Sequence, residues 1–175
     1  MTIVVVSGIP GSGKTTLAKQ LAPILGVPLI SKDVIKESLM DALGSGEMTW
    51  AMQLSRGAHV VMYDLAREMQ HGVVLEAHFH RGIAEPELEA LGRPLIQVFC
   101  QCPVELAWVR YQRRRDDPTR HPGHRPEHQD DDATRHWRET SPMPLVLAAP
   151  LIEVDTSQYV DVRTLADEIR ALRAS

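Results

Sequence analysis

Continuous apolar runs alternate along the chain with segments in which apolar residues recur every three or four positions. The runs predict buried strands, and the periodic segments predict helices that pack one face on a sheet. The predicted strands cover residues 3–6, 27–31, 73–77, 95–100 and 151–154. The predicted helices cover residues 17–25, 34–43, a longer stretch between the Gly44–Gly46 break and Gly72, then 103–115 and 162–172. Repeated strand–helix units imply a parallel sheet with right-handed crossovers.

Length and composition change this picture little. The 175 residues suit one domain, and 43% hydrophobic with 24% charged residues is ordinary for a soluble globular protein. A formal net charge of −4 argues against a surface devoted to nucleic acid, although a local basic groove remains compatible with it. No apolar run approaches the ~20 residues of a membrane span, and the first strand leaves no room for a cleavable signal. We therefore expect a cytoplasmic protein with two reduced cysteines, and the sequence leaves its oligomeric state open.

The segment between the first strand and the first helix matches G-x-x-x-x-G-K-[ST], the pattern of a phosphate-binding loop. Its glycines permit turns in which successive N–H groups point at a polyphosphate. In this pattern Lys14 reaches the β- and γ-phosphates, and the Thr15 hydroxyl ligates Mg²⁺. Strand, loop and helix all stand where the motif requires them. The sequence thus predicts a nucleotide-phosphate site built from Gly8, Gly11, Ser12, Gly13, Lys14, Thr15 and Thr16.

Acidic residues mark the ends of two other predicted strands. Asp33 follows the second strand, where open α/β sheets bind ligands, and can accept the proton of an attacking hydroxyl or hold a water of the Mg²⁺ shell. The alternative is that Asp33 only caps the next helix. Glu76 ends an apolar strand, as the second Mg²⁺-supporting motif does, with an ordinary strand-end charge as the alternative. His78 and His80 follow on the same loop and can contact substrate or be structural.

Arginines gather at the end of the helix over residues 103–115. Arg110, Arg113, Arg114 and Arg115 lie in it, and Arg120 follows in a polar segment over residues 116–133 that we expect to form a lid. Arg110 and Arg114 share a helix face. Arginines that close over a transferring phosphoryl group stabilise its charge. Because others can favour the helix C-terminus or stay solvated, we expect one to three of them to contact phosphate.

Taken together, these motifs resemble the small P-loop kinases of the AAA_33 type. The resemblance rests on residues 8–16, 31–36, 75–79 and 110–114 and on the Arg-His-Pro-Gly-His stretch at 120–124, in the family's order over nearly the whole chain. This group is similar to gluconate and shikimate kinases, chloramphenicol phosphotransferase, zeta toxins and the kinase domain of polynucleotide kinases. It implies an α/β P-loop NTPase fold, a three-layer α/β/α sandwich with a five-stranded parallel sheet in the order 2-3-1-4-5 and a lid at about 116–133.

The resemblance also implies roles for individual residues. Asp33 matches the carboxylate that activates the acceptor hydroxyl, and Lys36 stands where polynucleotide kinases tend to have an arginine that contacts the acceptor. Glu76 matches the acidic strand end that supports Mg²⁺ through water, whereas His78 replaces the asparagine often found there. Arg110, Arg114 and Arg120 match lid-region arginines that approach the ATP phosphates. The residues that lie where such kinases contact adenine are Asp155, Thr156 and Ser157.

The expected function is therefore an ATP- and Mg²⁺-dependent kinase that phosphorylates a hydroxyl of a small molecule. ATP is favoured over GTP because the sequence lacks an [NT]-K-x-D motif. A polynucleotide 5′-hydroxyl kinase needs a basic, aromatic-lined channel, which 5% aromatic residues and a negative net charge disfavour. A nucleotide-dependent ATPase or switch without an acceptor is the second alternative. Candidate acceptor-pocket residues are Trp50, Arg56, Tyr63, Arg67, His78, His80 and Arg81.

Overall fold

A single sheet of five parallel strands forms the centre of the computed structural model, which describes residues 2–115, 117–118, 120–124 and 143–174. The strands are β1 (Ile3–Ser7), β2 (Leu29–Ser31), β3 (Val73–Glu76), β4 (Leu95–Gln101) and β5 (Leu151–Asp155). Their order is β2-β3-β1-β4-β5, and every neighbouring pair is parallel. This confirms the strand order expected from the resemblance.

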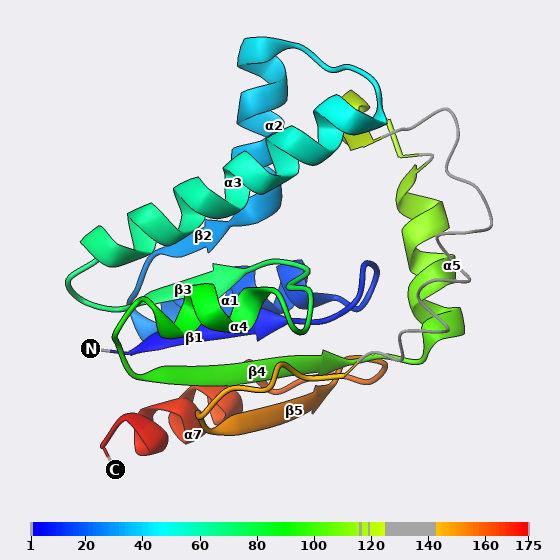
Figure 1. The fold of residues 1–175 in the computed structure, drawn as a ribbon. Coiled ribbons are helices and arrows are strands. Elements are labelled where there is room, and N and C mark those ends of the chain that lie inside the picture. Colours follow the sequence, from blue (N-terminus) through cyan, green and yellow to red (C-terminus); the bar gives the residue numbers. More distant parts are fainter. Residues whose placement is uncertain (1, 116, 119, 125–142, 175) are drawn as a thin grey trace.

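Helices cover both faces of the sheet (Figure 1). They are α1 (Lys14–Leu25), α2 (Lys32–Leu43), α3 (Met48–Glu68), α4 (Ala84–Glu89), α5 (Val104–Arg115) and α7 (Val162–Ala174), with a 3₁₀ turn, η1, at Pro122–His124. Side chains of α1 and α7 pack on one face, and those of α3 and α4 pack on the other. Helix α5 stands across the carboxyl ends of the strands, and α2 packs on α3 (Figure 1). Among the described helices, none is both long and apolar enough to cross a membrane.

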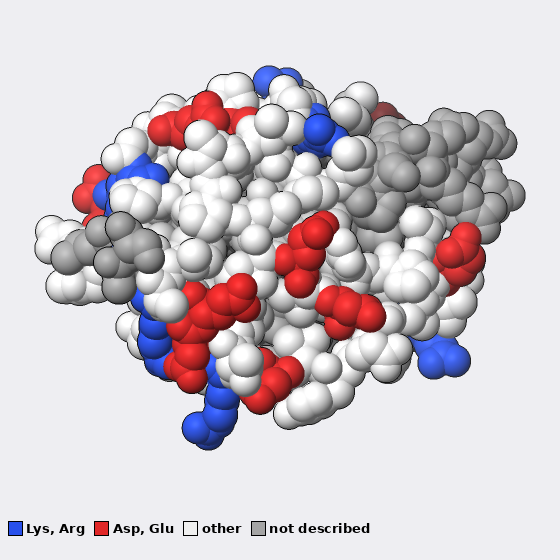
Figure 2. Space-filling model, turned by 90° about the horizontal axis from the view of Figure 1, so that it is seen from below, with Lys and Arg blue, Asp and Glu red and all other residues white. Residues whose placement is uncertain are grey.

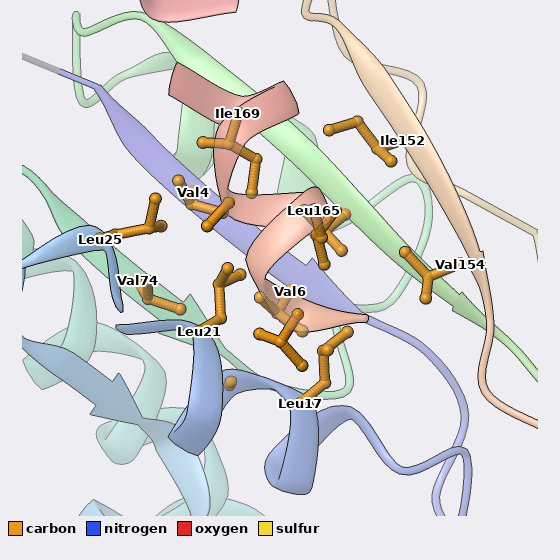
Figure 3. Packing of buried hydrophobic residues seen from close by; sticks show 14 of the residues in the cluster. Val4, Val6, Leu17, Leu21, Leu25, Val74, Ile152, Val154, Leu165 and Ile169 are labelled. Carbon is orange, nitrogen blue, oxygen red and sulfur yellow. The ribbon is translucent and has the colours of Figure 1, made fainter. Parts of the chain in front are cut away.

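Strand β1 shows why both layers form. All five of its residues are buried, and because side chains alternate along a strand they divide between the two faces. Val4 and Val6 lie with Leu21 of α1 and Ile169 of α7 in one core cluster (Figure 3). Ile3 and Val5 lie in the second cluster, with Met62 of α3 and Leu88 of α4. Burying one such aliphatic side chain contributes about 1.5–3 kcal/mol, so the period-2 pattern of β1 holds the sandwich together.

The predicted elements differ most from the observed ones in two places. Strand β2 begins at Leu29 rather than residue 27, because Gly26 ends α1 in a left-handed conformation and the Val27 N–H bonds to Ala22 O. The short helix α4 was not predicted, since its six residues include Pro86 and show too little periodicity. The predicted lid at 116–133 falls largely outside the described residues.

Candidate active site

The loop over residues 8–13 carries the chain from β1 into α1. Gly11 has φ = +84°, and a Cβ atom there would overlap the Ala107 carbonyl oxygen of α5. Gly13 precedes α1, also with positive φ, and makes no side-chain cap. The first-turn amides of α1 therefore remain available to an anion, which is the property that a helix N-terminus contributes to phosphate binding. The close approach of α5 explains why only glycine fits at position 11.

Glu76, at the end of β3, is the centre of a buried polar cluster. Its side chain is 1% exposed, and its two carboxylate oxygens accept hydrogen bonds from Thr15 Oγ1 at 2.9 Å and Ser31 Oγ at 2.6 Å. Lys14 Nζ lies 3.8 Å from the same carboxylate. A buried carboxylate needs such partners, because desolvation of an unpaired charge is costly.

The donor set of this cluster fits Mg²⁺. Magnesium prefers hard oxygen ligands and keeps several waters, so a threonine hydroxyl beside a carboxylate is suitable chemistry. The Thr15 Oγ1 to Glu76 Oε1 contact brings together the two residues predicted from sequence to hold the metal. Ser31 was not predicted, although its position at the end of β2, opposite Glu76 in the β2–β3 register, brings it to the same carboxylate.

A cleft of about 450 Å³, here called the α2-side cleft, opens beside this cluster. Predicted site residues that line it are Lys14, Thr15, Asp33, Lys36, His78, Arg114 and Arg120. Asp33 lies in the first turn of α2, whereas Ser31 occupies the cap position, so Asp33 is not the N-cap. The Asp33 side chain is 50% exposed, and Lys32 Nζ donates to its Oδ1 at 3.1 Å.

A second cleft of about 530 Å³, the α7-side cleft, lies on the other side of the loop. Predicted residues that line it are Gly11, Gly13, Thr16, Arg110, Arg113, Arg114 and Thr156. Arg110 Nη1 donates to Thr156 O at 3.0 Å, which ties α5 to the segment after β5. Arg114 lines both clefts, so its guanidinium belongs to the region where they meet. Gln20 and Gln158, which no sequence motif marks, also line this cleft.

His78 joins the loop after β3 to the phosphate-binding loop. Its Nδ1 lies 3.2 Å from Gly8 O, and because a carbonyl only accepts, Nδ1 carries the proton and Nε2 is left as an acceptor. Burial lowers the pKa of His78 to about 4, with smaller contributions from His80, Lys14 and Lys32. The His80 ring packs edge-on at 4.7 Å. At neutral pH, His78 is thus an uncharged hydrogen-bonding group in the α2-side cleft.

This lowered pKa predicts acid sensitivity. Between pH 6.5 and about pH 4, His78 binds a proton in the unfolded chain but not in the folded one. The free energy of unfolding should therefore fall as pH decreases through this window, by about 3 kcal/mol in total from this group, with no contribution above it. Urea unfolding of wild type and His78→Gln at several pH values measures the difference in slope. His71→Gln, which changes an exposed histidine, is the control; parallel wild-type and His78→Gln profiles would contradict the prediction.

Several other predicted residues lie outside both clefts. Tyr63 is buried in the core under α3, and Trp50 Nε1 donates to Gly44 O at 3.0 Å. Arg56 and Arg67 are exposed on α3, His80 is exposed, and Arg81 donates to Met143 Sδ at 3.0 Å. Asp155 accepts from Ser157 N and Ser157 Oγ in a local turn, so of the three predicted adenine-contacting residues only Thr156 lines the α7-side cleft. The geometry therefore brings the phosphate, metal and Asp33 predictions together. Of the predicted acceptor contacts, Lys36 and His78 lie in the α2-side cleft with Asp33, whereas the others lie outside both clefts.

Sequence comparison relates the chain to known proteins. Residues 3–140 match the model of the family AAA_33, described as an AAA domain. A cytidylate kinase from Ignicoccus hospitalis is 30% identical over 118 residues, which span 65% of each chain. A cytidylate kinase from Pyrobaculum neutrophilum is 36% identical over 90 residues, or 49% of each chain. The chain thus spans about half to two-thirds of the length of the curated relatives that it matches.

Comparison with solved structures finds the same fold. A protein from Chloroflexus aurantiacus j-10-fl, to which kinase activity is attributed, aligns with a TM-score of 0.87 and 27% identity, covering 98% of this chain and 97% of the other. A gluconokinase from Sinorhizobium meliloti 1021 aligns with a TM-score of 0.61 over 99% of this chain and 94% of its own. At 17% identity, this second likeness shows the fold alone.

Proposed function

Because the chain belongs to the AAA_33 family and has the fold of P-loop kinases, we propose that it transfers the γ-phosphoryl group of ATP to a hydroxyl of a small molecule, with Mg²⁺. One observation carries the proposal: Arg114 lines both the cleft beside α7 and the cleft that holds Asp33. The phosphoryl group is transferred from the nucleotide in one cleft to the acceptor in the other. A cation where the two clefts meet can therefore stabilise the negative charge of the transferring group.

The α7-side cleft is the proposed nucleotide site. The backbone amides of residues 8–16 and the Lys14 ammonium bind the β- and γ-phosphates, and Thr156 faces the adenine, next to the local turn formed by Asp155 and Ser157. Thr15 and Glu76 hold the metal, Glu76 through water, and the bound Mg²⁺ supplies positive charge to the phosphates. The metal assignment is supported by the Thr15–Glu76 hydrogen bond of 2.9 Å beside Lys14. The assignment of the nucleotide to the α7-side cleft is supported by Gly11, Gly13 and Thr16 of the phosphate-binding loop, which line it.

The α2-side cleft is the proposed acceptor site. Asp33 accepts the proton of the acceptor hydroxyl as its oxygen bonds to the γ-phosphorus and the bond from that phosphorus to the ADP oxygen breaks. Half of the Asp33 side chain is exposed, which leaves it accessible to an acceptor. Arg110 and Arg114 stabilise the transferring group from the nucleotide side, and Arg120 lies on the acceptor side. His78 Nε2 is placed to accept a hydrogen bond from the acceptor.

A polynucleotide acceptor is less favoured. Figure 2 shows the face to which β5 and α7 are nearest, with acidic side chains across its middle and basic side chains toward its margins. Among its described residues this face has no continuous basic track, and the 5% aromatic content and the net charge of −4 of the chain also disfavour a nucleic acid strand. A nucleotide acceptor has separate support from the matching cytidylate kinases.

The test is ADP production by the purified protein with ATP and Mg²⁺, alone and with sugars, cyclitols, aminoglycosides, nucleosides, cytidine 5′-monophosphate and a 5′-hydroxyl oligonucleotide. The proposal expects one class of small alcohol to stimulate turnover well above the rate without acceptor. Steady hydrolysis that no acceptor changes would instead identify an ATPase or switch. Stimulation by the oligonucleotide alone would move the function to the polynucleotide class.

A further inference from the structure

We infer that the acceptor carries an anionic group, a carboxylate or a phosphate, which Lys36 and Arg120 bind in the α2-side cleft. This inference rests on the proposed function and names the class of its acceptor. The two side chains come from different elements, Lys36 from α2 and Arg120 from the segment after α5, and both line the same cleft.

Among the described residues, Lys36 is a cation without a close counterion. It is half-buried, and within the described part of the chain no carboxylate lies at ion-pair distance from it. Asp33, the carboxylate that acts electrostatically on Lys36, is itself paired with Lys32 at 3.1 Å. Burial lowers the pKa of Lys36, Lys32 lowers it further, and Asp33 opposes both. A partly desolvated ammonium beside another cation is stabilised by an anion, so the cleft favours an anionic occupant at this point.

Arg120, in the segment after α5, also favours an anion in the α2-side cleft. Its guanidinium carbon lies 5.0 Å from the centroid of the Tyr111 ring, which fixes the plane of the group. One terminal nitrogen, Nη1, is buried and has no hydrogen-bond partner in the described residues. Buried donors are rarely left unsatisfied, and a planar guanidinium donor suits a carboxylate or phosphate oxygen.

The α2-side cleft carries more cations than the phosphate-binding loop itself contributes. Lys14 of that loop lines this cleft, whereas Lys36 and Arg120 come from α2 and from the segment after α5, and neither lines the nucleotide cleft. With Lys14 and Arg114 assigned to the nucleotide, the α2-side cleft keeps four cationic side chains against three carboxylates. His78 stays uncharged at neutral pH and adds no negative group. The remaining excess of positive charge is therefore on the acceptor side.

Matched acceptor pairs test the inference: gluconate and sorbitol, ribose 5-phosphate and ribose, and cytidine 5′-monophosphate and cytidine. In a pair that is turned over, we expect kcat/KM to be at least about tenfold higher for the anionic member. Lys36→Met should lower kcat/KM for the anionic member by about ten- to a hundredfold, whereas kcat/KM for the neutral member should stay within about threefold of wild type. Lys36→Arg should retain most of the activity toward the anionic member. Equal turnover of the neutral member would overturn the inference while the kinase assignment stands. The pair that responds distinguishes carboxylate from phosphate.

A binding measurement covers the case in which no pair is turned over. With ADP and Mg²⁺ saturating the nucleotide site, sulfate is titrated by calorimetry into wild type, Lys36→Met and Lys36→Arg. We expect sulfate to bind wild type and Lys36→Arg and to bind Lys36→Met at least about tenfold more weakly. Equal binding to all three proteins, or none to wild type, overturns the inference. If ³¹P NMR shows cytidine 5′-monophosphate converted to the diphosphate, the anionic cleft stands and the hydroxyl acceptor of the proposed function fails.

Discussion

Lys14→Ala should lower kcat/KM for ATP by about a hundredfold to a thousandfold, the cost of losing one preorganised group that stabilises transition-state charge. Lys14 is the first residue of α1, its side chain is 7% exposed, and its Nζ lies 3.8 Å from the Glu76 carboxylate, so alanine removes a buried cation beside the phosphate-binding loop. Steady-state kinetics of ADP formation, with ATP varied at fixed Mg²⁺, measures the loss. ATP affinity, followed by calorimetry, should weaken in parallel.

The domain should stay folded in Lys14→Ala. Glu76 loses the Lys14 cation but keeps its hydrogen bonds from Thr15 and Ser31, so both of its carboxylate oxygens still have a donor. Arg163→Ala removes an exposed cation of α7 and is the matched control, with activity close to wild type. Wild-type activity in Lys14→Ala would contradict the assignment of residues 8–16 as the phosphate site. Circular dichroism of both variants separates lost chemistry from lost structure.

Most of the fold could be predicted because its elements carry strong local signals. The buried run of β1 and the 3.6-residue periodicity of α1 and α7 each have a single interpretation. The family resemblance supplied the strand order, which local patterns do not contain, and the AAA_33 match confirms that resemblance. The predicted start of β2 was wrong by two residues. The Val27 N–H bonds to Ala22 O in the cap that ends α1, so Val27 belongs to the helix end, and an apolar run in the sequence does not reveal this backbone hydrogen bond.

The candidate site likewise contains residues that sequence motifs predict and residues whose roles depend on the tertiary structure. Thr15 and Glu76 are marked by a motif and by a strand end, and they meet in the structure. Ser31 has no such mark, because its role depends on β2 lying next to β3 in one register. The stacking of Arg120 on Tyr111 depends on how the chain turns after α5, which no periodicity encodes. Acceptor-pocket residues were chosen by chemical type alone, and type does not say that Tyr63 is packed in the core or that Arg81 turns toward Met143.

Asp33→Asn separates the proposed base from a structural residue. Asparagine has nearly the same size but accepts no proton, so we expect kcat to fall by about a hundredfold to ten-thousandfold. The KM for ATP should stay within about threefold, because Asp33 lines the α2-side cleft and not the nucleotide cleft. The helix should lose little stability, since Ser31 holds the cap position and a first-turn carboxylate contributes only about 0.3–1 kcal/mol.

The control for this variant is Asp167→Asn. It removes an exposed carboxylate of α7 that pairs with Arg170, and it should leave acceptor turnover unchanged. Rates are measured with whichever acceptor stimulates ADP production in the wild type. Turnover of Asp33→Asn within a few-fold of wild type would show that the acceptor hydroxyl loses its proton elsewhere. A kcat loss with unchanged KM for ATP would instead tie the chemistry to Asp33, a carboxylate of the α2-side cleft that lies in the first turn of α2 and pairs with Lys32.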